Sequence, residues 1–309
     1  MYKRQKFPAN LELVGASVTG YPYDNLTLGS FQGCANLTDV EFNPGVLLGV
    51  NCFAFSGIKE INWPEGMTIQ QGAFHDCNNL SKVTIPGHVT KIPNDAFYYC
   101  RGLTTATVED GVEIIGHRAF MNTPLQGGSG FKTVKEIQQG AFANTAGAFN
   151  GLPPNVEKVG DFAFWRAGIG PSFQLNDKVK SIDDCAFCGN HIRNVTFPEF
   201  PDADIDAIIK ERKLPIEFGS AVFANNAFTH VELPRWMVIV PYGMFEQKVD
   251  DQSYKMYDMG VDGSWYWPRP NTIEDYPDRR EMLETVVFAP GTVEIAVSYT
   301  HLTLPTNSR

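Results

Sequence analysis

A two-residue pattern, a small or apolar residue followed by phenylalanine, recurs ten times along the chain. The steps between successive phenylalanines are 24, 19, 23, 23, 22, 22, 23, 36 and 22 residues, so most units share one length and one unit carries an insertion. Such a short unit cannot bury its own apolar side, and it becomes stable only when copies stack around a shared core. The chain of 309 residues is therefore expected to form one repeat array. The ten pairs are Ser30-Phe31, Ala54-Phe55, Ala73-Phe74, Ala96-Phe97, Ala119-Phe120, Ala141-Phe142, Ala163-Phe164, Ala186-Phe187, Val222-Phe223 and Met244-Phe245.

Two further patterns predict the structure of each unit. The position five residues before each phenylalanine is apolar in all ten units. After the phenylalanine, the pattern apolar-x-x-apolar-x-apolar ends in the alternation that is typical of a strand, and a proline or glycine commonly stops it. Ala73, Phe74 and Cys77 have the spacing of one helix face. Each unit is thus predicted to contain a short strand, a turn, a second extended piece and one helical turn. The apolar positions are Leu26, Val50, Ile69, Ile92, Ile115, Ile137, Val159, Ile182, Phe218 and Val240.

The combination of these patterns resembles the BspA-like leucine-rich repeats of bacterial and protozoan surface proteins. The segment 80–100, which reads LSKVTIPGHVTKIPNDAFYYC, is close to that family's repeat, and the resemblance covers about residues 26–295. It implies an α/β fold, a right-handed leucine-rich-repeat solenoid of about ten units of 22–23 residues, with short parallel strands and one helical turn per unit. It departs from the family pattern at 121–133, 143–155, 199–215 and 246–282.

The two ends of the chain do not fit the repeat. Residues 1–5 and 297–309 resemble peptides that recur at the ends of assembled environmental reading frames, where sequencing-adapter DNA has been translated. They are treated as non-native, which leaves 6–296 as the solenoid; an ordinary basic N-terminus and a polar tail are the alternative. The net charge of −10 becomes −13 without these ends, since they carry three positive charges. This balance argues against nucleic-acid binding, and no apolar run is long enough to span a membrane.

The chemistry-bearing residues predict neither an enzyme nor a cofactor or metal site. Cys34, Cys77 and Cys100 occupy a position where a small apolar filler is expected, and a disulfide between Cys77 and Cys100 is the alternative. Cys185 and Cys188 form a single C-x-x-C pair, whereas zinc needs four ligands. The histidines fall at scattered polar positions, and no nucleophile, base and acid share a recognisable context.

The two insertions differ in character. Segment 199–215 contains Ile205, Ile208 and Ile209 at helical spacing, with acidic residues first and basic residues last, which predicts a surface helix packed on the solenoid. Segment 246–282 is rich in aromatic residues, which suit either a binding surface or the anchoring of the loop as a cap. Its candidate binding residues are Tyr254, Tyr257, Trp265, Tyr266 and Trp267, beside which Tyr276 also lies in the sequence.

A second candidate surface lies on the predicted strands. The positions between the apolar residues are expected to form one continuous polar sheet face, and solenoids use such faces to bind partners. The resemblance implies a secreted or surface-anchored, adhesin-like module that binds a protein on a host or neighbouring cell. A glycan-binding module that uses segment 254–267, and a scaffold arm of a larger enzyme, are the alternatives. The candidate face residues are Asp39, Glu41, Glu60, Asn62, Lys82, Thr84, Thr105, Thr107, Asn194, Thr196, His230 and Glu232.

Overall fold

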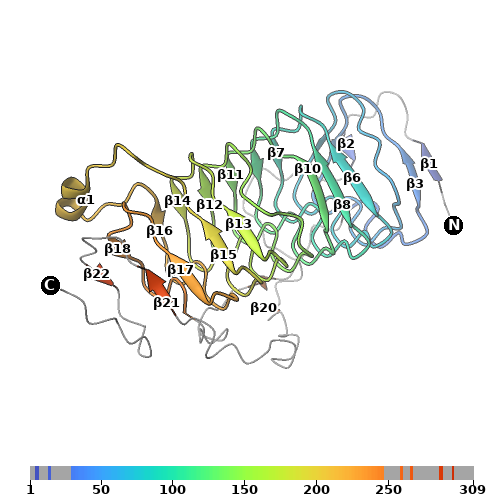
Figure 1. Ribbon diagram of the computed structural model, residues 1–309. Coiled ribbons are helices and arrows are strands. Elements are labelled where there is room, and N and C mark those ends of the chain that lie inside the picture. Colours follow the sequence, from blue (N-terminus) through green and yellow to red (C-terminus); the bar gives the residue numbers. More distant parts are fainter. Residues whose placement is uncertain are drawn as a thin grey trace.

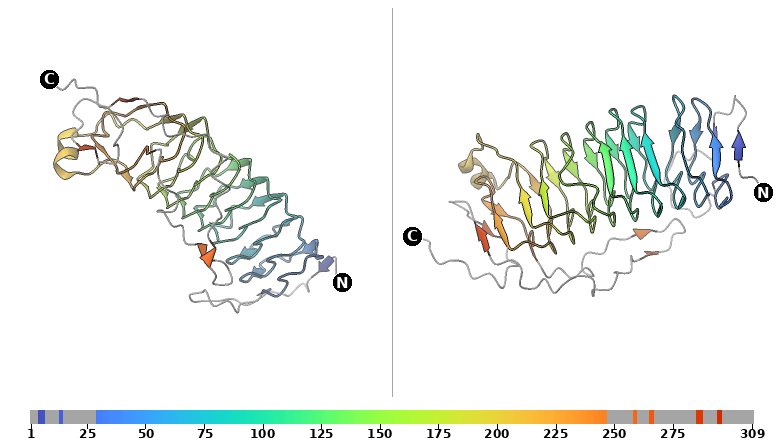
Figure 2. Two further views of the ribbon diagram at one scale, coloured as in Figure 1. Left: turned by 90° about the horizontal axis from the view of Figure 1, so that it is seen from below. Right: turned by 45° about the vertical axis from the view of Figure 1, so that its right-hand side comes forward.

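The chain forms an elongated solenoid of parallel strands with little helix. The computed structural model describes residues 29–246, together with the backbone of short strands between 4 and 14 and between 258 and 295. Successive units stack along one axis, and two sides of the stack each carry a set of short strands (Figure 1 and Figure 2). The first strand set is β1 (Arg4–Lys6), β3 (Asp39–Glu41), β6 (Lys82–Ile85), β8 (Thr105–Val108), β10 (Gly127–Gly130), β13 (Ser172–Gln174), β15 (Asn194–Thr196), β17 (His230–Glu232) and β21 (Thr285–Val287).

The second strand set holds two-residue strands. All its pairings are parallel, and its longest uninterrupted sheet has the order β16-β14-β12-β11-β9-β7. In β4, β5, β7, β9, β11, β12, β14 and β18 one of the two residues is buried in the core, as Ile92 is in β7. The set comprises β2 (Leu13–Val14), β4 (Leu47–Leu48), β5 (Thr68–Ile69), β7 (Lys91–Ile92), β9 (Ile114–Ile115), β11 (Glu136–Ile137), β12 (Lys158–Val159), β14 (Ser181–Ile182), β16 (Glu217–Phe218), β18 (Ile239–Val240) and β22 (Glu294–Ile295).

A third side of the solenoid is made of tight turns, where a helical turn was expected. The backbone N–H groups of Asp95, Phe97 and Tyr99 donate to carbonyls of the following unit, at distances of 2.9, 2.9 and 3.0 Å. These groups cannot also bond within a helix. Asp95 and Tyr99 have positive φ angles of 57° and 56°, which are incompatible with a right-handed helix. The segment is therefore a third ladder between units and not a helix.

The core is organised around a stack of phenylalanines. Successive rings lie 5.1–5.9 Å apart between centroids, and their planes are within 13° of parallel. Parallel rings at this separation are offset, which avoids the repulsion of a face-to-face sandwich. The stack runs through Phe31, Phe53, Phe74, Phe97, Phe120, Phe142, Phe164, Phe187, Phe223 and Phe245.

The second unit corrects the sequence-based alignment. Phe53, and not Phe55, occupies the stack: its ring is fully buried, whereas Phe55 is 42% exposed. Leu48 is likewise buried and pairs with Ile69, so Val50 is not the core position of that unit. The stacked phenylalanines are then 22 and 21 residues from their neighbours, instead of the irregular 24 and 19. Two small-residue–phenylalanine pairs lie side by side here, and the turn geometry selects the first.

The insertion at 199–215 contains the predicted helix. Helix α1 (Ile205–Glu211) begins after Asp204, whose side chain caps the helix by accepting a hydrogen bond from the Ala207 N–H. Ile208 is buried against the core, which confirms the predicted apolar face. The insertion does not interrupt the stack, because β14 pairs directly with β16 on its far side. In the same way, β17 pairs with β21 across the 246–282 insertion.

Candidate interaction surface

The predicted face residues lie on the outside of the first strand set. In β6, Lys82 and Thr84 are exposed while Val83 and Ile85 are buried, which is the alternation that the pleat imposes. The other predicted positions follow the same rule. Ten of the twelve are exposed and two, Glu41 and Thr107, are half-buried. The structure therefore places these side chains on one side of the solenoid, where they are not required for the core.

The sheet beneath this face is interrupted, contrary to the expected continuous surface. Glu60 and Asn62 lie in an extended segment without strand pairing, and segment 143–155 contributes only an isolated bridge between Gly151 and Gln174. The first strand set therefore consists of separate small sheets, including β10-β8-β6 and β13-β15. The second of these gaps lies between β10 and β13. It coincides with the segments 121–133 and 143–155, where the sequence departs from the repeat pattern.

A groove opens at this second gap. Its cavity has a volume of about 940 Å³ and lies between β10 on one side and β13 with β15 on the other. Gln174 and Asn150 are exposed lining residues that the sequence analysis did not single out. The signal for Gln174 was present, because it alternates with the buried Phe173 and Leu175 as a strand residue does.

The aromatic insertion is the other predicted site. Its residues Tyr254, Tyr257 and Trp267 lie outside the described part of the chain. Trp265 and Tyr266 form β20 (Trp265–Tyr266), whose backbone pairs antiparallel with β19 (Asp258–Met259). The role of these aromatic side chains therefore stays a prediction.

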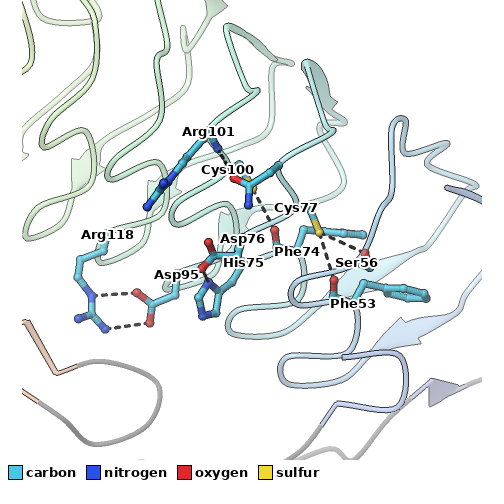
Figure 3. Close-up of polar contacts among 11 residues, drawn as sticks. Phe53, Ser56, Phe74, His75, Asp76, Cys77, Asp95, Cys100, Arg101 and Arg118 are labelled. Atoms are coloured by element: carbon cyan, nitrogen blue, oxygen red, sulfur yellow. Dashed lines mark hydrogen bonds and ion pairs between the residues drawn. The ribbon is translucent and has the colours of Figure 1, made fainter. Parts of the chain in front are cut away.

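Cys77 and Cys100 belong to a row of buried hydrogen-bond donors. The Sγ of Cys77 donates to the Phe53 carbonyl at 3.2 Å, and the Sγ of Cys100 to the Phe74 carbonyl at 3.0 Å (Figure 3). All six cysteines are free, so the alternative of a Cys77–Cys100 disulfide is wrong for this structure. Other units use the same position, three residues after the stacked phenylalanine, for a hydroxyl or an amide. Its polar members include Thr123, Thr145, Asn190 and Asn226, which all donate to phenylalanine carbonyls.

These thiols are poor nucleophiles in the folded protein. Burial raises the pKa of the Cys52 and Cys77 thiols to about 12, and burial raises the pKa of Cys100 well above its ordinary value. The thiolate is the reactive form, so these residues fill space and donate hydrogen bonds.

Thiol labelling tests this assignment. In the native protein at pH 8, iodoacetamide is expected to modify Cys34, which is exposed, and to leave the five buried cysteines unmodified. Mass spectrometry would then show one adduct, and the Cys34→Ser variant would show none. Rapid native labelling at Cys77 or Cys100 would contradict the burial of this row.

Neighbouring turn segments are also joined by a partly buried ion pair. Arg118 contacts both carboxylate oxygens of Asp95, at 2.8 Å through Nε and 3.0 Å through Nη2 (Figure 3). Gln71 donates to the same carboxylate at 3.1 Å. Because the Asp95 carboxylate is held from the unit before it and the unit after it, it ties three successive units together. No cluster of histidine, cysteine and acidic side chains within the described residues has a metal-binding arrangement.

The parallel strand sets, the stacked phenylalanines and the ladder of turns define a leucine-rich-repeat solenoid. The chain belongs to the BspA-type leucine-rich repeat family. The family described as "BspA type Leucine rich repeat region" matches residues 24–148 and 131–250, with six copies of the repeat. No curated protein matches the chain.

A solved bacterial protein shares the fold. A leucine-rich repeat protein from Bacteroides ovatus ATCC 8483 superposes with a TM-score of 0.50 and 14% identity, over 95% of this chain and 74% of that one. A leucine rich cell surface protein from Faecalibacterium prausnitzii A2-165 gives a TM-score of 0.40 and 18% identity, over 79% of each chain. In the described part of this chain, no helix has the length and apolar character needed to cross a membrane.

Proposed function

We propose that this protein is a non-catalytic, extracellular or cell-surface module that binds a protein on a host or neighbouring cell, in an adhesin-like role. The family is one of repeat surface proteins, and the solenoid, with about ten units proposed, offers a long side for a partner. The observation that carries the proposal is the row of exposed polar side chains on the first strand set. These side chains stabilise no part of the core, and together they present a broad face to solvent.

The composition of this face favours a protein partner over nucleic acid. Its charged members are four acidic residues and one lysine, while its middle is lined by threonine hydroxyls. Such a face would repel a phosphate backbone, which needs clustered positive charge. A non-obligate protein interface, in contrast, is about as polar as the rest of a protein surface and includes direct hydrogen bonds to polar side chains.

A matched pair of double variants tests the proposal. Thr84→Glu with Thr105→Glu adds two charges to the first strand set, and Thr68→Glu with Thr90→Glu adds the same charges at exposed positions elsewhere on the solenoid. Binding of the fluorescent protein to a panel of epithelial and bacterial cells is measured by flow cytometry. The first pair is expected to weaken binding at least about tenfold and the second less than about twofold, since an interface that buries a carboxylate without a partner loses its hydration.

Protease treatment of the cells separates the possible partners. Loss of binding after surface proteolysis supports a protein partner. Binding that survives proteolysis, is removed by glycosidases and is lost on Trp265→Ala would replace the proposal with the glycan-binding alternative through Tyr254, Tyr257, Trp265, Tyr266 and Trp267. Equal binding by both double variants would show that the polar face is not the interface.

A further inference from the structure

The gap between β10 and β13 leaves one strand edge without a neighbour. The Ala146 N–H still donates to the Leu125 carbonyl at 3.0 Å, just before β10. Beyond that point, the backbone of segment 147–153 makes no hydrogen bond to Gly127–Gly130 among the described residues, and turns instead toward Gln174. Leu152 N–H donates to the Gln174 carbonyl at 2.8 Å, and Gln174 N–H to the Asn150 carbonyl at 3.2 Å. The outward edge of β10 therefore faces the groove and not a strand of the next unit.

The shape of the groove suits an added strand. β10 consists of Gly127, Gly128, Ser129 and Gly130, so three of its four residues lack a side chain that would keep another backbone away. A Cβ at Gly128 would approach the Phe131 ring at 3.0 Å, and a Cβ at Gly130 would collide with the Val108 carbonyl. Four residues of an extended chain cover about 13 Å, and the cavity of about 940 Å³ has room for a segment of that length with its side chains.

The lining of the groove indicates which side chains would fit. Its base is apolar, because Phe131, Leu152 and Phe197 are buried there. Its ionisable lining residues are both acidic, namely Asp177 and Glu199, and both are exposed. The nearby Lys178 directs its ammonium to the Asn155 Oδ1 at 2.5 Å. An occupant with a basic side chain beside an apolar one would match this lining.

We infer that the groove binds an extended, basic polypeptide segment of the partner, which adds a strand to the free edge of β10. This inference rests on the proposed function and names the part of the partner that the protein recognises. The main-chain groups of the segment would bond to those of β10, while one side chain reaches the apolar base and a lysine or arginine pairs with Asp177 or Glu199. A sugar would use hydroxyl contacts and has no repeating N–H donors for a strand edge.

The test begins with a phage-displayed library of random twelve-residue peptides selected on the full chain. Selected peptides are expected to be rich in lysine or arginine. The tightest one is synthesised with a fluorescent label, and its affinity is measured by anisotropy. Thr196→Trp, which fills the groove from β15, is expected to weaken binding at least tenfold, as is the charge reversal Asp177→Lys with Glu199→Lys. Thr68→Trp adds the same ring at an exposed position outside the groove and is expected to change the affinity less than twofold.

Backbone methylation distinguishes strand addition from other modes. Only every second N–H of an added strand faces its neighbour. N-methylation of one alternate set of peptide nitrogens is therefore expected to abolish binding, and methylation of the other set to preserve it. Equal effects of the two sets, unchanged binding to the Thr196→Trp variant, or the failure to select any peptide would overturn the inference. The inference would also be overturned if an oligosaccharide from a glycan array bound the protein and the Thr196→Trp substitution abolished that binding. If the cell-binding experiment still depends on Thr84 and Thr105, the proposed function stands without the groove.

Discussion

Replacing Phe97 with alanine is expected to lower the free energy of unfolding by about 3–5 kcal/mol. The ring is fully buried in the middle of the stack, 5.9 Å from Phe74 and 5.4 Å from Phe120 between centroids. Its removal leaves a cavity between two rings that the ladders of turns and strands hold at fixed spacing, so the site cannot collapse fully. Urea unfolding followed by circular dichroism measures the effect.

The corrected alignment supplies a matched control for this experiment. Phe53→Ala should resemble Phe97→Ala, whereas Phe55→Ala should cost less than about 1 kcal/mol, because Phe55 is largely outside the core. Phe55 contacts the His75 ring at 4.8 Å, so a small loss is expected. A large loss for Phe55→Ala together with a small loss for Phe53→Ala would restore the alignment that the sequence first suggested.

Replacing Asn190 with leucine is expected to destabilise the protein by about 3 kcal/mol. The buried amide Nδ2 donates to the Phe164 and Phe187 carbonyls at 2.8 and 2.9 Å, and its Oδ1 accepts from the Ile169 N–H at 3.1 Å. Leucine has a similar size but removes all three hydrogen bonds. The buried Ile169 N–H then loses its acceptor, while the Phe164 and Phe187 carbonyls keep only the Ala167 N–H at 3.3 Å and the Asn226 Nδ2 at 2.9 Å.

The conservative variant separates hydrogen bonding from packing at this position. Asn190→Thr keeps a hydroxyl donor for the Phe187 carbonyl, as Thr123 does for Phe120 at 2.7 Å. It should therefore recover part of the stability in the same urea titration. Equal stability of the leucine variant and the wild type would show that the buried amide contributes no net hydrogen-bond energy.

The sequence predicted the solenoid because its signal is repeated. Each apolar position recurs at nearly constant spacing, and stacking places equivalent residues in contact, as the rings of Phe120 and Phe142 show at 5.4 Å. The prediction failed where two local matches competed. Cys52-Phe53 and Ala54-Phe55 both fit the small-residue–phenylalanine pattern, and only the turn geometry, with positive φ angles at Asn51 and Phe55 on either side of Phe53, decides between them.

The helical turn was predicted from spacing that a tight turn satisfies equally well. Residues three apart share a face in both structures, but in this protein alternate N–H groups leave the unit and bond to the next one. Whether the segment forms a helical turn or a tight turn depends on contacts between units, and a local sequence pattern does not describe these contacts.

The groove could not be predicted from the sequence for the same reason. Segment 143–155 visibly lacked a strand motif, but the cavity also needs side chains from β13 and β15, which are distant in the sequence.

The insertion at 199–215 shows that the rise of this solenoid is independent of the length of its units. The chain takes 36 residues from Phe187 to Phe223, yet the two rings lie 5.2 Å apart, as closely as those of units with 22 or 23 residues. The spacing is set by the contact between offset rings and by hydrogen bonds between units, such as that from the Cys185 N–H to the Ser220 carbonyl at 3.0 Å. The extra residues leave the stack at one corner. That corner is therefore a natural attachment point for a fluorescent domain, which would report on binding without changing the pitch of the proposed binding surface.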